Sequence, residues 1–182
     1  MSPLILIYFL IVFQGILLIF AFILAYWLIR GVFGVPYIRS EKKYSKAMLE
    51  LAKVTSSDVV VDFGSGDGSI VIHAAKTYGA QGIGFEHLYM LVLLARVRAF
   101  FFGVGNAVSF RHGNFLKIQK LPNATVICSY LFPEVNAKLE PLLLRDYPSG
   151  TRVVSRTFLF PTLVLKSTQK VGRETIYLYE IP

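Results

Sequence analysis

The chain has 182 residues, of which 54% are hydrophobic, and a formal net charge of +8 from 19 lysines and arginines against 11 acids. All of these charges lie beyond residue 29, and the one cysteine, Cys128, excludes a framework of intramolecular disulfides. Because the basic residues are scattered and no aromatic-rich RNA-binding motif accompanies them, we expect no nucleic-acid partner and favour anionic lipid head groups.

The first predicted element is a transmembrane helix at residues 4–29, a run of 26 residues with no charge and only Gln14 clearly polar. At about 1.5 Å per residue it would extend about 39 Å, more than the roughly 30 Å hydrocarbon core of a bilayer. Tyr26 and Trp27 would lie at the interface. A cleaved signal peptide is the alternative, but no basic residue precedes the run, its length is excessive, and no A-x-A site follows.

Basic residues flank only the far end of this predicted helix. They are Arg30, Arg39, Lys42, Lys43 and Lys46. The positive-inside rule therefore predicts a single-pass protein of the lipid bilayer with its C-terminal domain on the cytoplasmic side. We divide the chain into a transmembrane helix at 1–30, a linker with an N-terminal helix at 31–57, and one α/β domain at 58–182.

The remaining pattern alternates between strands and helices. Residues 31–39 read as a turn-rich linker, and Ser40 then caps a helix with an apolar face. Predicted strands lie at 59–63, 82–85, 107–111, 125–130 and 152–155, predicted helices at 69–78, 88–102 and 134–146, and a final hairpin at 163–167 and 174–180. This order predicts a doubly wound, Rossmann-like α/β fold with a seven-stranded sheet.

The helix at 88–102 has two interpretations. Its apolar face, which carries Arg96 and Arg98, could dock on lipid or pack on the sheet, and packing is favoured. Its 15 residues are too few and too charged to span a bilayer, so no second membrane helix is predicted.

A glycine-rich loop follows the first strand, in the sequence VVVDFGSGDGS at 59–69. Gly64, Gly66 and Gly68 let the backbone adopt positive φ and approach a ligand closely. Their G-x-G-x-G spacing differs from the G-x-G-x-x-G of nicotinamide and flavin folds. Asp62 and Asp67 would repel a pyrophosphate but suit the ammonium and sulfonium of S-adenosylmethionine, which indicates methyl transfer. Asp67 could instead cap the helix that follows.

The second strand ends at Glu86, 18 residues beyond Gly68. In folds of this kind a carboxylate near that spacing accepts hydrogen bonds from the ribose hydroxyls of the cofactor. A solvated acid after a strand is the alternative interpretation of Glu86.

Three motifs together resemble a known family. The segments DFGSGDGSI at 62–70, GFEH at 84–87 and SYLFPEV at 129–135 stand behind a membrane helix and a PYI segment at 36–38. In this combination the chain resembles the membrane-anchored seven-β-strand protein-lysine methyltransferases. Eukaryotic members of that family are mitochondrial and methylate lysines of the adenine nucleotide translocase and of the ATP synthase c subunit, and short prokaryotic relatives share the layout.

The resemblance implies a set of cofactor-binding residues. Asp62 and the three glycines would surround the methionyl part, Glu86 would hold the ribose, and Asn114 would reach the adenine. The full implied set is Asp62, Gly64, Ser65, Gly66, Asp67, Gly68, Glu86, His87, Asn114 and Phe115. Arg39, Ser40, Ser69, His87 and Asn114 depart from the usual family pattern. An asparagine oxygen can still accept from the adenine amino group, although a loop turn also explains Asn114.

The implied reaction is direct displacement at the sulfonium methyl by a neutral lysine amine. Deprotonating a lysine at neutral pH costs about 4 to 5 kcal/mol, so the site needs desolvation or a proton acceptor. Tyr130 and Glu134, at the end of the fourth strand, are the catalytic candidates.

Neighbouring residues are the candidates for substrate contact. Phe132 and Pro133 would wall a lysine channel, and Arg156 would contact the substrate. A stabilised apolar corner and ordinary packing are the alternatives. His73 and His112 have no partners at metal-ligand spacing, so no metal site is predicted.

The leading hypothesis is a membrane-anchored, S-adenosylmethionine-dependent protein-lysine N-methyltransferase that acts on a membrane protein. One alternative is a methyltransferase acting on a lipid, a quinone or another small molecule at the membrane. The other is an inactive scaffold, which the altered residues Ser69, His87 and Asn114 make conceivable.

Overall fold

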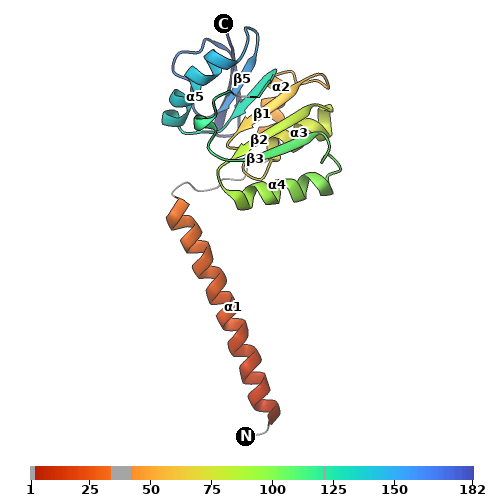
Figure 1. Ribbon diagram of the computed structural model, residues 1–182, viewed down its shortest axis with the longest axis vertical. Coiled ribbons are helices and arrows are strands. Elements are labelled where there is room, and N and C mark those ends of the chain that lie inside the picture. Colours follow the sequence, from red (N-terminus) through yellow and green to blue (C-terminus); the bar gives the residue numbers. More distant parts are fainter. Residues whose placement is uncertain (1–2, 34–41, 121) are drawn as a thin grey trace. The chain divides into compact units, whose positions relative to one another are not determined.

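A computed structural model describes residues 3–33, 42–120 and 122–182, with the exception of the side chains of residues 27–33. The chain divides into two compact units, Met1–Ile38 and Arg39–Pro182. The first contains a single long helix, and the second contains one sheet with helices on both faces (Figure 1).

Helix α1 (Pro3–Phe33) has 31 residues, and none of its described side chains, at 3–26, is buried. Of the helices in the described part of the chain, α1 is the one that is long and apolar enough to cross a membrane, by length and composition. The apolar helix predicted from the sequence is therefore present, and it continues to Phe33, into the predicted linker. The rest of that linker, the Ser40 cap and the side chain of Trp27 lie outside the described residues.

Seven strands form one sheet in the second unit, in the order β3-β2-β1-β4-β5-β7-β6. They are β1 (Val59–Phe63), β2 (Gln81–Glu86), β3 (Val108–His112), β4 (Val126–Ser129), β5 (Arg152–Arg156), β6 (Leu165–Val171) and β7 (Glu174–Glu180). The first five run parallel, and β7 pairs antiparallel with both β5 and β6. The predicted seven-stranded, doubly wound fold with a terminal hairpin is confirmed.

Helices cover both faces of the sheet, and each face has its own hydrophobic core. The larger core contains residues of α2 (Lys42–Leu51), α3 (Ser69–Tyr78) and α4 (Tyr89–Phe101). The smaller core contains residues of α5 (Pro133–Asp146), against which the short 3₁₀ helix η1 (Phe115–Lys117) also packs. Val60 faces the first core and Val61 the second, which explains the uninterrupted run of valines in β1.

The strand register brings the motifs to one edge of the sheet. Phe63 lies opposite Phe85 of β2 and Ser129 of β4. Because parallel strands end at the same edge, the glycine loop, Glu86 and Tyr130 gather there, as open α/β sheets arrange their ligand sites.

Candidate functional site

The glycine loop after β1 is a tight turn. The φ angles of Gly64, Gly66 and Gly68 are 82°, 54° and 77°, and residues other than glycine rarely adopt this backbone region. The N–H of Gly64 donates to the Phe85 carbonyl at 2.9 Å, which fastens the loop to the end of β2. A Cβ on Gly68 would lie 2.5 Å from the Phe110 ring. Both the conformation and the close packing therefore require glycine.

Asp62 is a buried carboxyl at the end of β1, beside Cys128 of β4. Burial, with the charges of Glu86 and Asp67, raises its pKa to about 8. Among the described residues no side-chain hydrogen bond or ion pair reaches the Asp62 carboxyl. A concentration of acids around a carboxyl that lacks a partner favours a cationic ligand, and the ammonium and sulfonium of S-adenosylmethionine fit this requirement.

Glu86 connects the loop to the start of α4. One carboxylate oxygen accepts from the N–H of Gly66 at 2.9 Å, and the other accepts from the N–H of Leu88 at 2.9 Å. Each oxygen has a second lone pair, so the carboxylate can still accept hydrogen bonds from two ribose hydroxyls. The two backbone contacts hold the side chain in one orientation.

Asp67 and Ser65 are engaged within the protein. Asp67 accepts hydrogen bonds from the N–H and hydroxyl of Ser69 and forms an ion pair with Arg98 of α4. Ser65 is buried with its hydroxyl packed over Gly84, where that hydroxyl has no partner among the described atoms. Arg98 was not predicted, since nothing in the sequence relates it to a loop about thirty residues earlier.

The three remaining predicted cofactor residues, His87, Asn114 and Phe115, lie around the ends of β2 and β3. His87 contributes its carbonyl to a 2.9 Å hydrogen bond with His112 Nε2, and the two rings lie 6.4 Å apart. Asn114 is exposed and its side-chain oxygen accepts from the N–H two residues later, which caps η1. The Phe115 ring lies 5.1 Å from Phe63. The structure thus places all of them at the same sheet edge as Glu86.

Tyr130, one residue past β4, is held against a buried arginine. The Arg156 guanidinium lies between the rings of Tyr44 and Tyr130, at 3.8 Å and 4.1 Å from their centroids. It also donates two hydrogen bonds to the carboxylate of Glu174. Burial raises the pKa of Tyr130, although the Arg156 charge opposes the change. The sequence indicated neither Tyr44 nor Glu174, which come from α2 and β7.

Aromatic residues line the edge beside Tyr130. The Phe158 ring lies 6.2 Å from that of Tyr130 and 5.7 Å from that of Phe132, which is exposed. Pro133 starts α5, and Glu134 is an exposed carboxyl in its first turn. The structure thus places Arg156 against Tyr130 and Phe132 beside the same Phe158 ring, and Pro133 and Glu134 follow at the start of α5.

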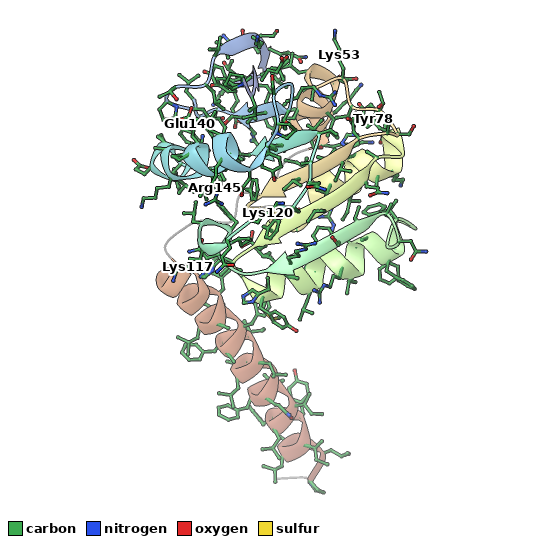
Figure 2. The ribbon with its side chains drawn as sticks, turned by 45° about the horizontal axis from the view of Figure 1, so that its top comes forward. Lys53, Tyr78, Lys117, Lys120, Glu140 and Arg145 are labelled. Atoms are coloured by element: carbon green, nitrogen blue, oxygen red, sulfur yellow. The ribbon has the colours of Figure 1, made fainter. Side chains whose placement is uncertain are left out.

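Helix α5 fixes the loop that carries Phe158. The amide of Asn136 donates to the carbonyls of Phe158 and Leu159 at 3.4 Å and 3.3 Å. Glu140, labelled on α5 in Figure 2, accepts from the N–H groups of Thr162 and Leu163. In the described parts of the chain no three His, Cys, Asp or Glu residues gather as metal ligands.

Comparisons with known proteins identify the family. Residues 62–167 match the family described as the ANTKMT methyltransferase domain. A protein-lysine N-methyltransferase of Saccharolobus islandicus is 36% identical over 154 residues, which cover 81% of this chain and 94% of the relative. The chain belongs to the ANTKMT methyltransferase family. It is an enzyme that uses S-adenosylmethionine as the methyl donor, as the sequence predicted.

Further relatives extend this picture. The ATP synthase c-subunit lysine N-methyltransferase of Xenopus laevis is 31% identical, and the adenine nucleotide translocase lysine N-methyltransferase of mouse is 30% identical. Each match covers 81% of this chain, and 64% and 63% of the two relatives. The crystal structure of an RNA methyltransferase from Salinibacter ruber, in complex with S-adenosyl-L-homocysteine, is 41% identical with a TM-score of 0.77, and the match covers 80% of this chain and 94% of that one.

Proposed function

We propose that this methyltransferase is a protein-lysine N-methyltransferase, anchored in a membrane by its N-terminal helix, that acts on a lysine of a membrane protein. The observation that supports cofactor binding is the buried carboxyl of Asp62 beside the carboxylates of Glu86 and Asp67. The lysine substrate is supported by the names of four relatives, from Saccharolobus to mouse.

The residues at the glycine loop would hold the methyl donor. When bound, S-adenosylmethionine supplies an electrophilic methyl group on a positively charged sulfur. A bound cation favours loss of the Asp62 proton, so Asp62 would become a counter-charge to the cationic end, and Glu86 offers fixed acceptors to the ribose hydroxyls. The backbone of Gly64–Gly68 forms the floor of this site, while His87, Asn114 and Phe115 are the proposed neighbours of the adenine.

The residues after β4 would receive the lysine. The Tyr130 phenol is protonated at neutral pH, as tyrosines ordinarily are, and burial raises its pKa further; its oxygen can accept a hydrogen bond that orients a lysine amine. Glu134, at the positive end of the α5 dipole, is the proposed anionic acceptor for the lysine proton. Phe132 and Pro133 would wall the approach. Arg156 would hold Tyr130 in position by stacking its guanidinium on the tyrosine ring.

The membrane part of the proposal rests on α1 and on the charge distribution. We propose a single-pass membrane helix at residues 1–30, a linker with an N-terminal helix at 31–57, and a methyltransferase domain at 58–182. The basic residues after the helix favour a cytoplasmic domain. Confining the enzyme and a membrane protein to one surface raises their effective concentration, so weak recognition suffices. The relatives named for the ATP synthase c subunit and the adenine nucleotide translocase are consistent with such a substrate.

A radiolabel experiment tests the substrate class. The full chain in native membranes is incubated with S-adenosylmethionine labelled in its methyl group, and the products are separated into protein, lipid and RNA fractions. Label recovered as methyl-lysine after acid hydrolysis supports the proposal. Label confined to lipid or quinone supports the small-molecule alternative, and label in RNA supports the activity named for the Salinibacter protein. Absence of donor binding by calorimetry supports a scaffold.

Two variants serve as a matched pair in this experiment. Glu86→Gln removes the charge from the proposed ribose acceptor and should strongly reduce labelling at a limiting concentration of the donor. Glu180→Gln makes the same chemical change on an exposed carboxyl at the opposite edge of the sheet. Glu180 lies there at the end of β7, in register with Arg152 at the start of β5. Labelling should survive that change. Equal labelling by both variants would contradict the assigned cofactor site.

A further inference from the structure

Helix α4 packs on the sheet through small residues and turns its large apolar side chains outward. The buried residues are Val92, Ala95 and Ala99. Met90, Phe100 and Phe101 are 73%, 75% and 79% exposed. The predicted packing on the sheet is therefore present, but it uses only the narrow small-residue side of the helix. Figure 1 shows α4 along one margin of the sheet, beside β3.

The exposed residues form a continuous surface. At about 100° per residue, Met90, Leu93, Leu94, Val97, Phe100 and Phe101 share one half of the helix circumference. Arg96 lies at the margin of this half, where it donates to the Phe110 carbonyl at 2.8 Å. The surface of a soluble protein rarely presents so many large apolar side chains together, and such a patch marks an interaction site.

All charged residues in the surrounding sequence are basic. Between Glu86 and Glu134 there is no Asp or Glu, whereas this stretch contains Arg96, Arg98, Arg111, Lys117 and Lys120. Arg111, Lys117 and Lys120 are exposed, and Figure 2 labels the two lysines in the connection from β3 to β4. An apolar helix face within a cationic surface is the composition of segments that bind anionic membranes.

We propose that the outer face of α4 docks on the surface of a bilayer that contains anionic lipids, with its apolar side chains in the boundary between head groups and acyl chains. The occupant is a lipid surface and not RNA, because this face presents hydrocarbon and aromatic rings where phosphate contacts need donors. This proposal rests on the proposed membrane anchorage. Residues 34–41, between α1 and α2, span at most about 30 Å, so the domain stays within reach of the bilayer that holds α1.

Docking through α4 has a consequence for the active site. The N–H of Leu88, directly before α4, donates to the carboxylate of Glu86. The first turn of α4 is therefore attached to the proposed ribose acceptor. With α4 at the membrane surface, the cofactor site lies beside the head groups, which selects lysines close to the bilayer over lysines far from it.

Depth-sensitive labelling of the full chain in lipid nanodiscs tests the docking. Cys128 is buried, so an introduced exposed cysteine carries the dye alone. An environment-sensitive fluorophore is placed at Phe101→Cys on α4 and, as the control, at Thr168→Cys on the opposite edge strand β6. We expect a shift to shorter emission wavelength, and loss of most emission to quencher-bearing lipids, at position 101 and not at 168. The effect should be larger with anionic lipid than with zwitterionic lipid alone.

Other outcomes overturn the proposal. Water-like emission at position 101 in both lipids would show that α4 does not dock. Shielded emission without quenching by the labelled lipids would show that a second copy or another segment covers α4. Shielding that appears only on addition of RNA would assign the face to nucleic acid.

A variant pair separates this proposal from the proposed function. Phe101→Ser should reduce methylation of a membrane-embedded substrate while the affinity for S-adenosylmethionine, measured by calorimetry, stays unchanged. Val164→Ser removes an exposed apolar side chain outside α4 and should leave both unchanged. Normal methylation by Phe101→Ser would refute a role of docking, whereas loss of donor binding in the unmodified chain would refute the proposed function itself.

Discussion

Replacing Asp62 with asparagine should make the protein more stable near neutral pH while it weakens donor binding. In the folded protein Asp62 retains its proton up to about pH 8, whereas an ordinary aspartate loses it near 3.8. Between these pH values the folded state binds one proton more than the unfolded chain. The free energy of unfolding therefore falls as pH rises through this window, by about 1.4 kcal/mol per pH unit.

The magnitude follows from the width of the window. Because pH 7 lies about three pH units above the ordinary aspartate pKa, the buried carboxyl lowers the free energy of unfolding at pH 7 by about 4 kcal/mol. Asparagine has a similar shape and no proton to lose, but its buried amide would lack partners at a cost of about 1 to 3 kcal/mol. The net gain at pH 7 is thus about 1 to 3 kcal/mol. From pH 5 to pH 8 the advantage of Asp62→Asn should grow by about 4 kcal/mol, or roughly 10 °C in Tm.

The assay is thermal unfolding of the full chain in detergent micelles, followed by circular dichroism at pH 5 and pH 8. Asp58→Asn is the matched control. Burial alone would raise the pKa of Asp58, but hydrogen bonds from Thr125 and Thr55 and the charge of Arg152 outweigh it and lower the pKa. The ionised Asp58 carboxylate therefore stabilises the fold above about pH 4, and this stabilisation is lost only in more acidic solution. Asp58→Asn should be less stable than the original protein by the same amount at pH 5 and at pH 8.

Donor affinity completes the test. Removing the counter-charge at Asp62 should weaken S-adenosylmethionine binding roughly 10- to 100-fold, the range of a hydrogen bond to a charged group. Identical pH dependence of the original protein and Asp62→Asn between pH 5 and pH 8 would refute the reasoning, because Asp62 would then be an ordinary ionised acid.

Three further predictions concern the remaining site residues. Glu86→Gln should weaken donor binding by calorimetry roughly tenfold or more, with an unchanged circular dichroism spectrum, because an amide is a poorer acceptor than a carboxylate. Tyr130→Phe should lower kcat with little change in donor affinity, and an unchanged kcat would remove the hydroxyl from the proposed site. Arg156→Lys should cost about 1 to 3 kcal/mol of stability, since lysine can neither stack between Tyr44 and Tyr130 nor bind Glu174 through two donors. If Arg156 positions Tyr130, kcat should also fall while KM changes little.

The parts of the site that follow directly from a strand end could be predicted from the sequence. The glycine spacing encodes a backbone conformation, and Glu86 stands at a fixed distance along the chain from Gly68. The apolar character of β1 likewise reports burial on both faces, because the sheet is covered on each side. These are local properties, and local sequence determines them.

The contacts that hold the site together could not be predicted. Arg98 reaches Asp67 across 31 positions, and Arg156 meets Tyr44 of α2 only because the fold brings β5 beside that helix. No spacing rule relates such residues. The orientation of α4 was equally hidden, since apolar residues surround most of its circumference and small residues, not large ones, face the sheet.

The position of Cys128 protects the enzyme from its own reagent. A thiolate attacks electrophilic carbon readily, and the chain's single thiol lies on the strand next to the carboxyl proposed to bind the methyl donor. Burial, with the charge of Asp62, raises the pKa of the Cys128 thiol well above its ordinary range. The sulfur therefore stays protonated and a poor nucleophile at neutral pH. Alkylation of the enzyme's own thiol by the methyl donor is thus disfavoured by the same burial that raises the pKa of Asp62.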